Sequence, residues 1–369
     1  MKIITGTIIF LITGQFVYGQ LSTNNFSKIL DSIYTSNPET IGIMVHIECS
    51  NRKISWSGAV GYSNKQEKTK LEINQPVLIA SNTKTFVAST ILRLAEERQL
   101  LLTTTIDNYL SERTQSLLKN NGYSIDCIQI THLLSHTSGI GNYADSPEFK
   151  EKIYLNPNYK WTRQEQIELA VLKMNKIGNA GEKYNYSDTN YLLLSEIIEE
   201  ATHLEYYTAI RKLIDFKKND LNKTWFPPLE QAPGNCSLLA HQYIGKMEID
   251  SYKLDKSFDL YGGGGLASPS KDLALFFHKL FNNKIFNNPQ TINILLTKIK
   301  TIQKPDTDYR FGVWQSDLDN KTAYGHGGFW GSMVYYIPET NLAISVIVLE
   351  KDKSSLRKEI AESMIKGFQ

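Results

Sequence analysis

Apolar positions change their spacing along this chain. Near the beginning, residues 41–50 and 53–63 form strand-like runs, separated by a short turn-like pair. Strand-like runs return near the end, at 311–315, 331–338 and 342–350. The pattern therefore predicts β-strands at both ends of the sequence.

The middle of the chain has the spacing of amphipathic helices. Its clearest example is 84–98, where Phe86, Val87, Ile91 and Leu94 fall on one face. Further helices are predicted in the middle and near both termini, at 165–176, 189–202, 205–214, 270–282, 25–36 and 353–367.

Strands at both ends with helices between them predict an α+β fold. One antiparallel sheet, flanked by terminal helices, would carry an inserted helical lobe. We expect the sheet lobe to contain about 20–78 and 300–369, and the helical lobe about 79–299. Repeats and Pro/Ser-rich linkers are absent from the sequence, so 20–369 is expected to be one unit.

The N-terminus reads MKIITGTIIFLITGQFVYGQ, with Lys2 ahead of the apolar stretch 3–17 and Gly19 before an expected cut at Gln20. This pattern is typical of a secretory signal peptide, here 1–19. Roughly 16 apolar residues fall short of the ~20 that a membrane span needs. We expect a secreted or periplasmic protein with no stable membrane span; an uncleaved N-terminal anchor is the alternative.

Composition, net charge and cysteine content argue against several classes of partner and site. With 41% hydrophobic and 21% charged residues, the chain has the make-up of a globular protein. Its net charge of +2 is too small to indicate nucleic acid or an anionic membrane surface as a partner. The three cysteines, Cys49, Cys127 and Cys236, form no disulfide framework, and no Cys or His pair has metal-binding spacing. We expect no metal and no other cofactor.

A Ser-x-x-Lys pair at Ser81 carries the first chemical signal. The apolar run 76–80 leads into Ser81 and the helix 84–98 follows, so Ser81 should lie at a helix N-terminus, which favours developing negative charge. Lys84 would lie one turn on, on the same face. A lysine in a partly apolar site has a lowered pKa, so it can accept the proton of a weak hydroxyl nucleophile. The same spacing also starts at serines in less suitable contexts: Ser50, Ser116, Ser268, Ser355 and Ser363.

Two later segments could complete such a site. Tyr186-Ser187-Asp188 lies in a loop between predicted helices, where Tyr186 could act as a phenolic acid or base; the alternative is an aromatic-rich loop that packs on the core. His326-Gly327-Gly328 precedes a predicted strand, and its glycines allow close backbone approach. A backbone N–H there could face an oxyanion, the alternative being a glycine-rich turn with a surface histidine.

Two common motifs are absent. The run Tyr261–Leu266 lacks the Lys-Ser/Thr of a phosphate loop, so nucleotide binding is not expected. The sequence also has no G-x-S-x-G, which argues against an α/β-hydrolase.

Together these segments resemble the serine β-lactamase and penicillin-binding protein superfamily, especially class C β-lactamases, D-alanyl-D-alanine carboxypeptidases and related esterases and D-aminopeptidases. That family has Ser-x-x-Lys, Tyr-x-Asn and Lys- or His-x-Gly in this order. Here they stand as Ser81 to Lys84, Tyr186 to Asp188 and His326 to Gly328. The phrases LLSHTSG, YSDTNYLLLSEIIEE, GGGGLASPSKDLALF and GHGGFWGSM are also similar, and the resemblance covers roughly 25–369.

The resemblance implies a serine hydrolase with the sheet and inserted helical lobe described above. Ser81 would form an acyl-enzyme with a small-molecule or peptide substrate, and water would release the product. Lys84 and Tyr186 would share the general acid and base work. The backbone N–H groups of Ser81 and Phe329 would form the oxyanion hole.

Three departures from the family pattern bear on the substrate. Asp188 stands where the family usually has Asn, His326 replaces the Lys of β-lactamases, and Glu350 stands where many relatives carry Asn. We therefore expect two additional acids and one fewer fixed cation in the cleft, so substrates with a free carboxylate should anchor less well. Efficient β-lactam turnover is not expected, and steady-state kinetics with nitrocefin would check this.

A D-alanyl-D-alanine carboxypeptidase-like peptidase and an esterase are the leading alternatives for the reaction. An ester, an amide or a peptide with a free amine should fit at least as well as a substrate with a free carboxylate. A non-hydrolytic penicillin-binding or sensor-type relative, and a weak β-lactamase, remain as further alternatives.

Overall fold

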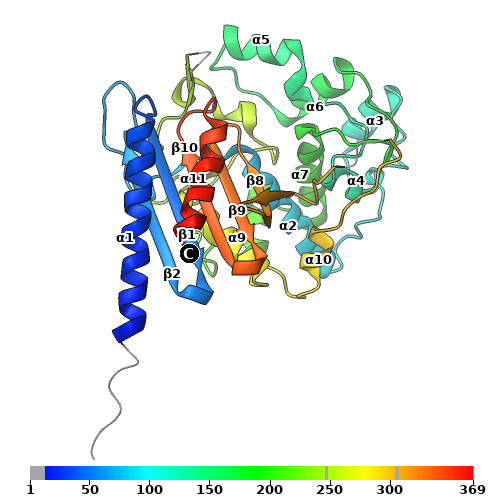
Figure 1. The fold of residues 1–369 in the computed structure, drawn as a ribbon. Coiled ribbons are helices and arrows are strands. Elements are labelled where there is room, and N and C mark those ends of the chain that lie inside the picture. Colours follow the sequence, from blue (N-terminus) through cyan, green and yellow to red (C-terminus); the bar gives the residue numbers. More distant parts are fainter. Residues whose placement is uncertain (1–12, 246–247, 304–306, 369) are drawn as a thin grey trace, which may run out of the picture.

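The computed structural model describes residues 13–245, 248–303 and 307–368, and it is built around one antiparallel sheet (Figure 1). The strand order is β2-β1-β10-β9-β8-β7, so strands from both ends of the chain lie side by side. The strands are β1 (Gly42–Cys49), β2 (Ile54–Gly61), β7 (Trp314–Leu318), β8 (Lys321–Gly327), β9 (Ser332–Ile337) and β10 (Leu342–Val348).

Alternation along the strands sends side chains to opposite faces of the sheet. On β1, Ile43, Val45 and Ile47 belong to an outer core, whereas Met44 belongs to the larger inner core. The register pairs Val45 with Val346 on β10, in the middle of the sheet. Apolar side chains on both faces explain why β1 and β10 are almost continuously hydrophobic.

Two terminal helices cover the outer face of the sheet (Figure 1). They are α1 (Thr13–Ser36) and α11 (Ser354–Lys366), which contact β2 and β10 respectively. Phe26 of α1 is fully buried, and its ring lies 5.4 Å from that of Trp56 on β2. The predicted flanking helices are thus present, and together they enclose the outer core.

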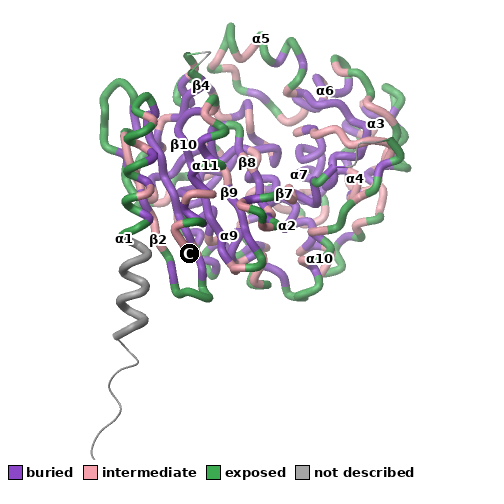
Figure 2. The backbone as a smooth tube through the Cα atoms, in the orientation of Figure 1, coloured by how far each residue is buried: buried purple, intermediate pink, exposed green. Residues whose placement is uncertain are grey.

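The inner face is covered by α9 (Ser270–Phe281), although α9 falls in the 79–299 stretch. Beyond it lies the helical part, with α2 (Thr83–Glu96) and α7 (Asp188–Thr202) buried at its centre (Figure 2). The remaining helices are α3 (Glu112–Asn120), α4 (Ile130–Leu134), α5 (Pro147–Leu155), α6 (Arg163–Leu172), α8 (Tyr206–Leu213) and α10 (Thr291–Leu295). Two short strand pairs complete the chain: β3 (Val77–Leu78) with β6 (Ala267–Ser268), and β4 (Tyr243–Ile244) with β5 (Ile249–Asp250).

The predicted α+β architecture is confirmed, but the strand prediction missed β8. Its glycines suggested a turn, yet Gly325 lies in the sheet opposite Tyr335, where a Cβ atom would lie 2.0 Å from the carbonyl oxygen of Val334. Glycine is thus required there by close packing between strands. The helices α3, α5 and α10 were also not predicted, and the strand expected at 311–315 begins only at Trp314.

Most of the predicted signal peptide, 1–19, lies outside the described residues and stays a prediction. Within the described chain, every helix is too short or too polar to cross a bilayer.

Replacing Phe26 should loosen α1 from the sheet. Because the ring is fully buried, Phe26→Ala is expected to lower the free energy of unfolding by about 3–5 kcal/mol. Urea unfolding would measure this, with Lys28→Ala on the exposed side of the same helix as a control that should change stability by less than ~0.5 kcal/mol. Equal stability of the two variants would show that α1 does not hold the outer core.

Candidate active site

Ser81 lies where the short strand β3 turns into α2. A 3-10 turn, Ala80–Asn82, stands between them, so the predicted position at the head of a helix is confirmed. Ala80 has a φ of +45°, a left-handed conformation that is unfavourable for a residue with a Cβ atom. This strained residue directly precedes the partly exposed Ser81.

The Lys84 side chain is completely buried, and its ammonium group has three acceptors. Nζ donates to Ser81 Oγ at 2.9 Å and to the carbonyl oxygen of Gly263 at 2.5 Å, and it lies 2.5 Å from Asp188 Oδ1. The first two contacts are hydrogen bonds and the third is an ion pair, so the lysine charge is compensated within the protein.

The charge state of Lys84 differs from the sequence-based expectation. Burial alone would lower its pKa, but the carboxylate of Asp188 and the oxygen of Tyr186 outweigh burial and hold the pKa above the ordinary lysine value. Lys84 is therefore an ammonium in the free protein, and the expected neutral lysine is wrong. The sequence argument considered desolvation without the ion pair.

Tyr186 comes from the loop that precedes α7. Its ring centroid lies 5.0 Å from Lys84 Nζ, and its hydroxyl group lies close to the side chains of Lys84 and Ser81. Burial raises the pKa of the Tyr186 phenol, and the Lys84 charge only partly offsets this effect. The ring packs on His136, with centroids 4.3 Å apart. Ser81, Lys84 and Tyr186 thus meet as the motif order indicated, with Tyr186 as a neutral phenol.

Asp188 is the first residue of α7, and its backbone N–H donates to Asn142 Oδ1 at 3.1 Å. Its side chain is 18% exposed and pairs with the buried Lys84. A neutral asparagine at this position could not compensate the lysine charge. The departure from the family pattern therefore makes the centre of the site an ion pair.

His326 lies at the end of β8 and is only 2% exposed. Nδ1 donates to the carbonyl oxygen of Gly327 at 2.8 Å, and Nε2 accepts from the hydroxyl group of Tyr309 at 3.2 Å. Burial and the nearby Lys84 lower the pKa of His326 to about 3, so the ring is neutral. His326 lies behind the Tyr186 ring, at 6.3 Å between centroids, and supplies no cation to the site.

The turn after β8 brings Gly328 and Phe329 to the nucleophile. A Cβ atom on Gly328 would lie 2.2 Å from the carbonyl oxygen of Ile79, so only glycine allows this approach. Within the described chain, the backbone N–H groups of Ser81 and Phe329 donate to no other group. Both are therefore available to a ligand, as an oxyanion hole requires.

Glu350 does not contribute an acid to the site, contrary to the expectation. Its Oε2 accepts the backbone N–H of Ile41 at 2.9 Å, and Oε1 lies 3.4 Å from Lys353 Nζ. The neighbouring Lys351 points to the site instead, with Nζ 3.7 Å from the centroid of the Phe329 ring. The strand end thus supplies a cation where we expected an acid.

A cavity of about 640 Å³ opens at Ser81. Tyr186, Asp188 and Phe329 also line it, and most of the remaining wall is apolar. Those other lining residues are Tyr143, Ala144, Phe149, Lys150, Ile153, Tyr154, Ile244, Ile249, Leu254, Phe258, Asp259 and Lys351.

Asp259 is a second acid in this cavity, and the sequence analysis missed it. Burial and the neighbouring Asp188 raise its pKa to about 7. Its carboxyl group forms no hydrogen bond with the rest of the described chain, and it lies over Gly264, where a Cβ atom would come within 2.2 Å of Oδ1. The glycine run 262–265 therefore makes room for Asp259, a role that the sequence analysis did not recognise.

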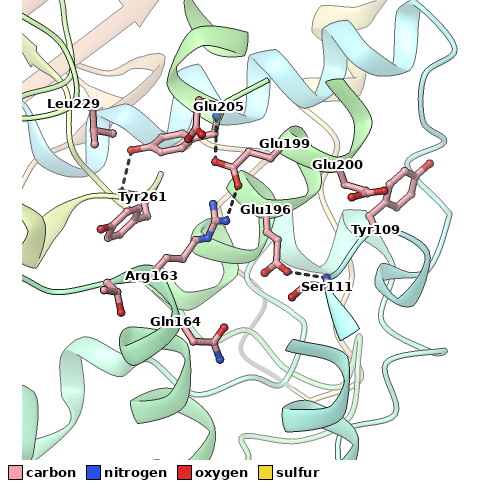
Figure 3. A pocket seen from close by; sticks show the side chains of 12 residues that line it. Tyr109, Ser111, Arg163, Gln164, Glu196, Glu199, Glu200, Glu205, Leu229 and Tyr261 are labelled. Carbon is pink, nitrogen blue, oxygen red and sulfur yellow. Dashed lines mark hydrogen bonds and ion pairs between the residues drawn. The ribbon is translucent and has the colours of Figure 1, made fainter. Parts of the chain in front are cut away.

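Another cavity of about 640 Å³ lies among α6, α7 and the segments beside them (Figure 3). Two of the acids that line it have partners: Glu199 lies 2.5 Å from Arg163, and Glu196 accepts from the backbone N–H of Ser111 and the hydroxyl group of Thr114. These contacts hold helices together, and the cavity contains no Ser-Lys pair.

The described residues contain no group of three or more His, Cys, Asp or Glu side chains arranged to hold a metal ion. The functional groups at the Ser81 site are a hydroxyl group, a phenol, an ion pair and two backbone N–H groups.

Several known proteins are similar to this chain in sequence. A penicillin-binding protein of Bacillus subtilis (strain 168) is 24% identical over 317 residues, covering 81% of this chain and 66% of that protein. Teichoic acid D-alanine hydrolase of Staphylococcus aureus is 27% identical over 295 residues, covering 78% of this chain and 65% of that protein. The matched part thus spans just under two thirds of the length of these relatives.

Among solved structures, the D-amino acid amidase of Ochrobactrum anthropi SV3 has a TM-score of 0.78 at 19% identity, covering 94% of this chain and 98% of that one. A D-stereospecific amidohydrolase from Streptomyces sp. has a TM-score of 0.75 at 21% identity, covering 93% and 98%. These likenesses establish the fold. The family model described as Beta-lactamase matches residues 39–364, most of the chain, and the protein belongs to the beta-lactamase family.

Proposed function

We propose that this protein is a serine hydrolase that cleaves an ester or amide through an acyl-enzyme on Ser81. The observation that carries the proposal is the position of Ser81, whose hydroxyl group accepts a hydrogen bond from the Lys84 ammonium and lies beside both the Tyr186 phenol and an open cavity. A hydroxyl group needs such partners, because it is a weak nucleophile on its own.

The proton route follows from the charge states. Lys84 stays protonated, so Tyr186 is the group that relays the proton. As Ser81 Oγ bonds to the substrate carbonyl carbon, its proton passes to the Tyr186 oxygen, and the phenolic proton passes to the leaving alcohol or amine. The fixed charge of Lys84 stabilises negative charge on either oxygen. In the second step water attacks the acyl carbon, and the same relay returns a proton to Ser81.

The backbone N–H groups of Ser81 and Phe329 are suited to bind the carbonyl oxygen as it becomes negative. Each such donor is typically worth about 10²–10³ in rate.

The cavity favours an acyl group that carries a free ammonium. Asp188 is already paired with Lys84, but Asp259 places a second carboxyl group in the cavity, and an ammonium ion would compensate its charge. The names of the amidase and the D-alanine hydrolase describe substrates built on amino acids, which is consistent with this choice. We propose an aminoacyl ester, amide or short peptide as the substrate, and only weak activity on β-lactams.

A non-hydrolytic binding or sensor function is the second candidate. The Lys84–Asp188 ion pair favours it, because a lysine held as an ammonium cannot act as a base. In that case Ser81 would acylate slowly or not at all.

We further propose that the protein is secreted or periplasmic, on the strength of the signal-like pattern in 1–19; mass spectrometry of the mature N-terminus would check for cleavage.

A fluorophosphonate probe should label the wild-type protein, and Ser81→Ala should abolish labelling. Tyr186→Phe should slow turnover of p-nitrophenyl acetate by about 10²–10⁴-fold, because it removes the proton relay. Ser116→Ala, the exposed serine of another Ser-x-x-Lys pair, is the control and should behave as wild type. An unlabelled wild-type protein would favour the binding function.

Asp188→Asn tests the ion pair. Asp188 raises the pKa of Lys84, so its removal lets burial lower that pKa and lets Lys84 lose its charge at lower pH. Asp188 also raises the pKa of Tyr186, which moves in the same direction. The alkaline limb of the pH dependence of kcat/KM should therefore shift to lower pH. Glu148→Gln on exposed α5 should leave the profile unchanged, and an unchanged profile in Asp188→Asn would refute the assigned charge states.

Asp259 should make binding of cationic substrates depend on pH. Its pKa is about 7, so the carboxylate forms as pH rises through that value and attracts an ammonium group. For an aminoacyl p-nitrophenyl ester, kcat/KM should rise through about pH 7, and the rise should vanish in Asp259→Asn. The matching ester without the amine is the control. If both esters respond alike, Asp259 does not select the ammonium group.

A further inference from the structure

Arg357, on the outer helix α11, reaches the turn that carries Phe329. Only 9% of the residue is exposed. Its Nη1 donates to the carbonyl oxygen of Ser332 at 2.8 Å and to that of Gly328 at 3.3 Å. A buried guanidinium thus binds both ends of a five-residue turn at the edge of the cavity.

The contact with Gly328 matters because of peptide geometry. The carbonyl oxygen of Gly328 and the N–H of Phe329 belong to the same peptide group, and in a trans peptide they point in opposite directions. Arg357 and the backbone N–H of Gly331, at 3.1 Å, hold the oxygen on the protein side. The Phe329 N–H must then point away from Arg357.

The same turn is fastened to the nucleophile segment. Asn82 Nδ2 donates to Ser332 Oγ at 2.9 Å, and Ser332 Oγ donates to the carbonyl oxygen of Ile79 at 3.1 Å. The backbone N–H of Gly328 also donates to the carbonyl oxygen of Ser332 at 2.8 Å. The two candidate oxyanion donors therefore belong to one hydrogen-bonded unit. Arg357 adds a positive charge to the side of this unit that carries Phe329.

A charge bound to the oxygen of a peptide also strengthens the N–H of that peptide as a donor, because hydrogen bonds in series polarise one another. We propose that Arg357 is a positioning residue that orients and polarises the Phe329 N–H for the oxyanion. This inference rests on the proposed function, since it assigns part of the same site.

Arg357→Met tests the inference, because methionine keeps an unbranched apolar side chain and removes the charge and both hydrogen bonds. For p-nitrophenyl acetate, kcat should fall about 10- to 100-fold, somewhat less than the loss of a whole oxyanion donor, with KM changed less than about threefold. Lys358→Met is the matched control: it is the next residue on α11, its side chain is 54% exposed, and it should leave kcat unchanged.

Chemical rescue separates positioning from folding. Added guanidinium at non-denaturing concentration should restore part of kcat in Arg357→Ala and have no such effect on Lys358→Met. Arg357→Lys should retain more activity than Arg357→Met because it keeps a charged donor. A folded Arg357→Met with wild-type kcat, or a loss of activity that tracks thermal unfolding and resists rescue, would overturn the assignment.

Failure of the proposed function has a different signature. If the wild-type protein neither turns over esters nor reacts with the fluorophosphonate probe, the hydrolase proposal falls. Hydrogen exchange of 328–332, followed by mass spectrometry, then decides the positioning role by itself. Exchange of the Gly328 and Gly331 amides should accelerate in Arg357→Met and stay slow in Lys358→Met; unchanged exchange would refute the role of Arg357.

Discussion

A buried ammonium group organises the centre of this protein. Lys84 lies away from solvent, and a charge in that position is tolerated only when it is paired and every donor is satisfied. Its three acceptors come from three segments far apart in sequence: the nucleophile turn, the glycine run at 263 and the start of α7. Gly263 can approach because its missing side chain would lie 3.3 Å from the Cβ atom of Asp188. The needs of one cation thus fix the relative positions of Ser81 and Asp188.

The sheet supplies the other half of the site through its backbone. On β8, Gly325 pairs with Trp314 of β7. Beyond this pair β8 continues as His326 and Gly327 and then enters the turn with Phe329. Side chains from the helical part and amides from the sheet therefore face each other across Ser81. The neutral His326 and the aromatic rings around it support one side of the Tyr186 ring.

Sequence reasoning recovered the fold class, most of the long helices and the meeting of Ser81, Lys84 and Tyr186. Local spacing sufficed for these features, because the periodicity of a helix and the residues of each motif can be recognised within a short stretch of sequence. Sequence reasoning failed where a property of the site depends on contacts between residues that are far apart in sequence. The sign of the Lys84 pKa shift depends on Asp188, about a hundred positions away, and Asp259 enters the cavity through a glycine run with no acidic motif. Glu350 was misplaced because adjacent residues at a strand end point in opposite directions.

The central position of β10 has a consequence for biosynthesis. This strand pairs with β1 on one side and β9 on the other, so β1 and β9 cannot be joined in one sheet until β10 has been made. Ser332, which fastens the turn with Phe329 to Ile79, also follows Ile79 by 253 positions. A growing polypeptide therefore contains Ser81 and Lys84 long before it contains the groups that would make them reactive. Such late closure favours slow folding through long-range contacts.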